Sequence, residues 1–135
     1  MSIYISEMQM KIPFFDCDPM GIVWHGNYVK YLEIARCDMF DKLGYNYLDM
    51  KTDGFAFPIA KMDMKFIKPA KFNMDIKIVV SIEDVEPSLN IKYQIFDTLN
   101  GQKIFSAKSM QICISLKSGE STYSVPIRLK ELLHV

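Results

Sequence analysis

Asp16, Asp18, His25 and Tyr28 stand close together in the segment FFDCDPMGIVWHGNY, near the start of the chain. A carboxylate can attack an acyl carbon or activate water, and two carboxylates on one side of an extended chain would make one of them the stronger base. Free backbone N–H groups at the start of a following helix would polarise a carbonyl oxygen. These residue types favour acyl transfer to water.

The same residues also have a purely structural interpretation. The order Asp18–Gly21, with Asp first, Pro second and Gly fourth, is typical of a type I turn. His25 can be held at a helix entrance by a hydrogen bond alone, and Trp24 and Tyr28 are of types that fill cores. The residues by themselves leave both interpretations open.

Several other functional classes lack the residues that they need. The chain has 2 histidines and neither an H-E-x-x-H nor a G-x-S-x-G segment, so we expect no metal site and no serine hydrolase. Gly21 and Gly26 have the spacing of a phosphate loop, but Asn27 and Tyr28 replace its Lys and Ser/Thr. The 16 basic and 16 acidic residues balance, so we expect no nucleic-acid partner.

Length and cysteine content predict the class of protein. The chain has 135 residues, half of them hydrophobic, which predicts a single domain over residues 1–135 with a substantial core. Cys17, Cys37 and Cys113 are odd in number and include no C-x-x-C, so we expect a reducing compartment. We see no signal peptide and no membrane span, and therefore expect a soluble cytoplasmic protein without a membrane partner.

Hydrophobic periodicity predicts the elements that must position the aspartates. Apolar residues at every third or fourth position predict a helix over residues 28–43, with Asn27 as N-cap and Gly44 just after its end. The Asn100-Gly101 pair predicts a tight hairpin in which both residues tolerate positive φ. Alternation predicts five strands, and a short terminal helix follows them: Ile3–Ile12, Ile59–Ile67, 74–83, Ser88–Asp97 and Gln102–Leu116, then Pro126–Leu133.

The order of these elements predicts an α+β fold. One long helix and one antiparallel sheet of about five strands follow in the order β, α, β, β, β, β. A single helix covers one sheet face only, so the other face and the sheet edges favour a second subunit.

Two segments resemble a known family. Asp16–Tyr28, followed by Tyr31 and by E-x-A-R at residues 33–36, is similar to the D-x-D-x-x-G-x-V-x-H-x-x-Y…E-x-A-R signature of the 4-hydroxybenzoyl-CoA thioesterase family of hotdog-fold proteins. Met64–Lys71 is similar to that family's strand-and-turn segment. With the element order, the resemblance covers nearly the whole chain except its last twenty residues.

The resemblance implies a hotdog fold, in which a curved antiparallel sheet wraps a long helix. It implies a homodimer or homotetramer with active sites at the dimer interface, and an acyl-CoA thioesterase that acts on short-chain or aromatic acyl-CoA or on acyl-ACP. No cofactor is implied, because the coenzyme A thioester is the substrate. Asp18 would be the catalytic carboxylate, as nucleophile or general base, and the N–H of His25 would hold the thioester oxygen.

Further site residues follow from the same resemblance. The side chain of His25 would orient substrate or water. The family's basic cluster for the coenzyme A phosphates is replaced here by Val85–Pro87, so Lys68, Lys71 or Arg128 would have to bind them. The residues that we expect to support or contact the substrate are Asp16, Trp24, Asn27, Tyr28, Lys68 and Lys71. The alternatives are a non-catalytic hotdog protein that binds an acyl or aromatic ligand, and a hotdog hydratase or dehydratase.

Overall fold

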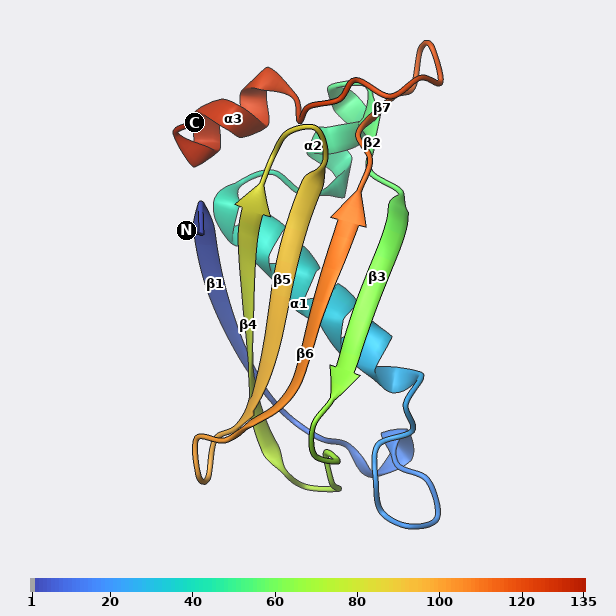
Figure 1. Ribbon diagram of the computed structural model, residues 1–135, viewed down its shortest axis with the longest axis vertical. Helices are drawn as coiled ribbons and strands as arrows, with labels where there is room; N and C mark the ends of the chain where they lie inside the picture. The colour runs from blue at the N-terminus through green and yellow to red at the C-terminus, as the bar shows by residue number, and fades with distance from the viewer. Residues whose placement is uncertain (1) are drawn as a thin grey trace.

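Five antiparallel strands form the central sheet of the computed structural model, which describes residues 2–135 (Figure 1). Their order across the sheet is β1-β4-β5-β6-β3, so β1 and β3 are the edges. This arrangement confirms the predicted α+β class. The strands are β1 (Tyr4–Lys11), β3 (Ile59–Phe66), β4 (Asp75–Asp84), β5 (Leu89–Asp97) and β6 (Lys103–Gln111).

Helix α1 (Asn27–Leu43) lies across one face of this sheet (Figure 1). Tyr31, Leu32 and Met39 are at most 1% exposed, so the predicted apolar stripe faces the core. Gly44 follows the helix with φ of 87°, as expected for its end. The predicted N-cap is wrong: Gly26 holds that position, and no side chain of residues 2–135 caps the helix.

The segment between α1 and β3 contains two short elements that were not predicted. Helix α2 (Tyr47–Thr52) begins with a capping box between Asn46 and Asp49, and β2 (Phe55–Ala56) pairs with β7 (Ile114–Ser115) in a second small sheet. The long strand predicted to end at Leu116 is therefore split. Elements of two to six residues are too short to show a hydrophobic period. Helix α3 (Ile127–Leu133) was predicted.

The turn between β5 and β6 is longer than predicted. Gly101 has φ of 73°, whereas Asn100 is not among the residues with positive φ. The N–H of Gly101 donates to the carbonyl of Asp97 at 2.8 Å, and Asp97 N–H donates to Gln102 at 2.9 Å. A two-residue type I′ hairpin needs positive φ at both central positions, so a four-residue loop forms instead.

The two ends of the sheet carry different structures (Figure 1). The loop before α1 lies at the end where β3 finishes, and α2, β2 and β7 lie at the other end. Strand β3 is exposed along most of its length, with Met64 at 41% and Phe66 at 50%. Within residues 2–135, no helix combines the length and the apolar character that a bilayer crossing requires.

Candidate active site

The segment before α1 forms a short hairpin. Cys17 pairs with Val23, and Asp18 N–H donates to the carbonyl of Ile22 at 2.8 Å. At the tip, Gly21 N–H donates to the carbonyl of Asp18 at 2.9 Å, which is the i to i+3 bond of the predicted turn. The turn prediction is therefore confirmed, and the aspartate belongs to the turn.

The two oxygens of the Asp18 carboxylate have different surroundings. Its Oδ1 accepts the backbone N–H of Met20 at 2.9 Å and that of Ile22 at 3.3 Å. No group among residues 2–135 donates to Oδ2, and the residue is half-buried. The two hydrogen bonds to Oδ1 hold the carboxylate in one orientation. Oδ2 therefore has a fixed position and is available to another group.

Free backbone N–H groups lie at the start of α1. Those of Asn27 and Tyr28 donate to the carbonyls of Trp24 and His25 at 2.9 and 3.3 Å. Those of His25 and Gly26 donate to no acceptor within residues 2–135. Because the N-terminus of a helix also carries a partial positive charge, these two groups are suited to an oxyanion.

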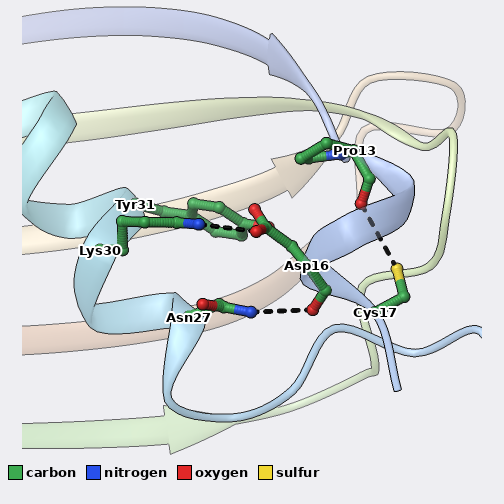
Figure 2. Close-up of polar contacts among 6 residues, drawn as sticks. All are labelled: Pro13, Asp16, Cys17, Asn27, Lys30 and Tyr31. Carbon is green, nitrogen blue, oxygen red and sulfur yellow. Dashed lines mark hydrogen bonds and ion pairs between the residues drawn. The ribbon is translucent and has the colours of Figure 1, made fainter. Parts of the chain in front are cut away.

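Asp16 has a different environment from Asp18, although one residue separates them. It ends a 3-10 turn, η1 (Phe14–Asp16), and is 4% exposed. Tyr31 Oη donates to its Oδ2 at 2.7 Å and Lys30 Nζ to its Oδ1 at 2.6 Å (Figure 2). Because Asp16 ends a helical turn, the extended chain that would place both carboxylates on one side does not form here. Asp16 ties the hairpin to α1.

Asn27 and Tyr31 complete this attachment. Asn27 Nδ2 donates to the carbonyl of Asp16 at 2.9 Å (Figure 2), so its side chain holds the hairpin instead of capping the helix. Burial, and then the hydrogen bond to Asp16, raise the pKa of Tyr31, which keeps its hydroxyl a donor.

Trp24 and His25 form an exposed aromatic pair beside the helix start. Their ring centroids are 5.1 Å apart, and Trp24 is 55% exposed. The indole lies over Gly26, where a Cβ would come within 2.1 Å of Trp24 Cζ3. Only glycine therefore lets the indole lie there.

Tyr28 lies in the core. It is 3% exposed, and it stacks on Phe105 with centroids 4.8 Å apart. Its hydroxyl accepts the N–H of Ala70 at 3.1 Å, and burial raises its pKa. Tyr28 thus joins the two segments that carried the family resemblance.

Lys71 lies beside the hairpin, and the other predicted phosphate ligands lie elsewhere. Lys71 forms an isolated antiparallel β-bridge with Ile22 through its backbone, and the residue is exposed. Lys68 Nζ donates to Gln102 Oε1 at 2.8 Å, at the β5–β6 turn. Arg128 of α3 pairs with Asp49 and Asp53, at 3.5 and 3.4 Å.

The turn that lacks the family's basic cluster has an internal partner. Glu86 pairs with Lys130 of α3, and Ser124 Oγ donates to it at 3.1 Å. The hydrogen bonds from Lys130 and Ser124 lower the pKa of Glu86. The acidic residue therefore attaches the C-terminal helix to this turn.

The family model of the Thioesterase-like superfamily matches residues 12–133, which include the hairpin, α1 and all strands of the central sheet except β1. The chain belongs to this superfamily. The acyl-CoA thioesterase YbgC of Helicobacter pylori strain 26695 is 29% identical over 134 residues, which cover 94% of this chain and 98% of that protein. The 4-hydroxybenzoyl-CoA thioesterase of Pseudomonas sp. strain CBS-3 is 31% identical over 80 residues, 57% of each chain.

Solved structures show the same fold in this thioesterase superfamily. A DHNA-CoA thioesterase from Staphylococcus aureus has a TM-score of 0.78 at 26% identity, over 88% of this chain and 80% of that one. An aspartate-to-asparagine mutant of 4-hydroxybenzoyl CoA thioesterase, complexed with 4-hydroxybenzoyl CoA, has a TM-score of 0.82 at 25% identity, over 96% and 98%. The predicted hotdog fold is confirmed, and the protein is a thioester hydrolase.

Cys17 is the third titratable group of the hairpin of this thioesterase. Burial, followed by the charges of Asp16 and Asp18, raises the pKa of its thiol. Its Sγ donates to the carbonyl of Pro13 at 3.8 Å (Figure 2). The raised pKa favours the protonated thiol.

Sequence reasoning missed Gln111. This residue is 2% exposed, and its Nε2 donates to the carbonyl of Phe57 at 2.8 Å. Its Oε1 has no hydrogen-bond partner within residues 2–135. The available signal was the alternation of β6, in which Phe105 and Ala107 point inward and polar Ser109 and Gln111 continue the same phase.

Proposed function

We propose that the protein hydrolyses a short-chain or aromatic acyl thioester of coenzyme A or of an acyl carrier protein, with Asp18 as the catalytic carboxylate. One observation carries the proposal: the turn fixes Oδ1 of Asp18 through two backbone N–H groups, and Oδ2 has no protein partner among residues 2–135. A carboxylate held in this way can face a substrate without reorganising.

Two courses of the reaction are compatible with this carboxylate. As nucleophile, Oδ2 attacks the thioester carbon and expels the thiolate, and water then hydrolyses the mixed anhydride. As general base, Oδ2 takes a proton from water, whose oxygen attacks the carbon, and the departing thiolate takes up a proton. A single turnover in H₂¹⁸O tests the choice. Label found in Asp18 shows that water opened an anhydride at the Asp18 carboxyl carbon, whereas the general-base course puts the label only in the released acid.

The start of α1 supplies the second part of the proposed mechanism. The free N–H groups of His25 and Gly26 would bind the thioester oxygen as it gains negative charge. The side chains of His25 and Trp24 are exposed beside them and would orient the substrate. Asp16 and Asn27 would act as positioning residues, because they hold the hairpin against α1.

A second copy of the chain would complete the site. The edge strand β3 is exposed, and Ile59, Met64 and Phe66 are 39%, 41% and 50% exposed. Such an apolar edge is a template for pairing with another strand. We propose a homodimer joined through the β3 edges, and either this dimer or a pair of dimers in solution.

The remaining parts of the proposal concern partners and environment. Lys71 beside the hairpin, and Lys68 at the β5–β6 turn, would contribute to binding the carrier's phosphates. We propose no resident metal or cofactor, and a cytoplasmic protein. Activity that survives dialysis against EDTA would agree with the absence of a resident metal.

A panel of acyl-CoA substrates with a thiol reagent tests the proposal. Asp18→Asn should lower kcat by about 10²–10⁴-fold, because the free oxygen becomes an amide nitrogen. Asp97→Asn is the matched control, since Asp97 Oδ1 also accepts a turn N–H, that of Leu99 at 3.0 Å. Equal hydrolysis by Asp18→Asn and the parent would reject the site. No thiol release from any substrate would favour the ligand-binding alternative.

A further inference from the structure

A hollow of about 260 Å³ lies between the second half of α1, helix α2 and the end of β6. Arg36, Cys37 and Phe40 line it from α1, Met50 from α2 and Gln111 from β6. It is far from the hairpin of the same chain: Arg36 lies ten residues after Gly26, which is about 15 Å along a helix.

Gln111 gives this hollow an unused acceptor. Its side chain is held in one orientation, because Nε2 donates to the carbonyl of Phe57 and the flipped amide would place two oxygens together. Its Oε1 is buried with no donor among residues 2–135. A buried acceptor without a partner is unfavourable for folding, so its presence next to a hollow points to a donor on a ligand.

Arg36 adds donors to the same hollow. It is 3% exposed, with Nη1 donating to Tyr93 Oη at 3.4 Å and Nη2 paired with Glu33. The pair with Glu33 neutralises its charge, so a further anion is not required. A hydroxyl group suits this setting, because it can donate to Gln111 Oε1 and accept from a guanidinium N–H.

Pairing of two β3 edges would bring this hollow to the active site of the other copy. Phe66, at one end of β3, contacts Tyr28 with ring centroids 5.0 Å apart, next to the start of α1. Ile59, at the other end, is in register with Gln111. A two-fold pairing of antiparallel edges sets the end of one strand beside the start of the other. In such a pair, the Asp18 hairpin of one copy would face the hollow of its partner.

We infer that this hollow binds the distal end of the acyl group whose thioester lies at Asp18 of the partner subunit, and that Gln111 selects acyl groups bearing a hydroxyl at that end. The inference rests on the proposed function. It goes beyond that function by naming the residue that sets specificity, the atom that accepts the hydrogen bond, and the subunit that supplies both.

Matched substrates test the selection in the unmodified protein. We expect kcat/KM to be about 10- to 100-fold higher for 4-hydroxybenzoyl-CoA than for benzoyl-CoA, or for 6-hydroxyhexanoyl-CoA than for hexanoyl-CoA. A ratio near one for both pairs overturns the inference and leaves the proposed function intact. No hydrolysis of any of the four rejects the proposed function instead.

Gln111→Met removes the acceptor with little change in side-chain volume. It should bring the ratio of kcat/KM between the hydroxylated and the unhydroxylated substrate close to one, while hydrolysis of the unhydroxylated acyl group persists. Gln94→Met is the matched control, because Gln94 lies on the β5 register opposite Val79, away from the hollow. It should keep the ratio of the parent. A preference that Gln111→Met retains, with a cooperative thermal transition showing that the variant folds, overturns the role of Gln111.

Mixed dimers test which chain supplies Gln111. Asp18→Asn and Gln111→Met chains with different affinity tags are co-expressed, and the mixed dimer is purified through both tags. If Gln111 serves the partner's Asp18, the mixed dimer holds one complete site and regains the hydroxyl preference of the parent. If both residues serve one site in the same chain, the only active site has Met at 111, and the preference stays absent, which overturns the arrangement across the interface.

Discussion

Asp16 and Asp18 are the same residue type, separated only by Cys17, with opposite surroundings. Both oxygens of Asp16 accept hydrogen bonds from α1 side chains, and the residue is 4% exposed. Asp18 has one oxygen on backbone N–H groups of its own turn and the other oxygen free among residues 2–135. A satisfied carboxylate contributes structure, and a half-satisfied one is available for reaction.

The contrast comes from the partners rather than from the carboxylates. The partners of Asp16 are 14 and 15 residues away in sequence, on α1, whereas those of Asp18 are two and four residues away. Asp16 therefore depends on tertiary packing, and Asp18 on a local turn. Replacing each should affect different properties of the protein.

Asp18→Asn should separate activity from stability most strongly. Asparagine keeps an oxygen that can accept the N–H groups of Met20 and Ile22, so we expect the free energy of unfolding to change by no more than about 0.5 kcal/mol. Turnover should fall by the factor of about 10²–10⁴ given above. Urea unfolding beside steady-state kinetics measures both, and a loss of stability matching the loss of activity would contradict the contrast.

Asp16→Ala should act mainly on stability. It leaves the buried hydroxyl of Tyr31 without its acceptor, at a cost of about 1–3 kcal/mol. Asp16→Asn, which can still accept from Tyr31, should recover part of this loss. Urea unfolding at fixed pH is the measurement. An Asp16→Ala protein as stable as the parent would show that the buried contacts of Asp16 contribute nothing.

Lys30→Met should have a smaller effect on the same contact. Lys30 is 46% exposed on its side chain, so solvent screens its pairing with Asp16. We expect a loss of about 0.2–1 kcal/mol that shrinks as salt is added. A loss as large as that of Asp16→Ala would mean that the ion pair, and not Tyr31, holds the hairpin.

The smallest effect concerns the residue between the two aspartates. Burial and the two carboxylates raise the pKa of the Cys17 thiol, so a smaller fraction is thiolate at any given pH than in the unfolded chain. Iodoacetamide should therefore alkylate Cys17 more slowly in the folded protein than in urea at pH 8, and the rate should rise with pH. Mass spectrometry of the Cys17 peptide measures it, and equal rates would contradict the shift.

Much of the fold was predictable because its causes are local. The apolar spacing of α1, the alternation of the five main strands and the turn at Asp18 each depend on residues a few positions apart. The short elements α2, β2 and β7 escaped prediction, because two of them exist only as partners of each other. The N-cap was missed because Asn27 turns its side chain to Asp16, which sequence spacing does not reveal.

The sequence by itself determined the long helix, the strands, the family and the turn that holds Asp18, since these rest on short-range patterns and on residue type. Only the tertiary structure decided that Asp16 is buried against α1. The same holds for Gln111, whose Nε2 donates to the carbonyl of Phe57, 54 residues away, while its Oε1 has no partner among residues 2–135. Such contacts join distant segments, and they follow from how the helix and sheet pack rather than from the order of the residues.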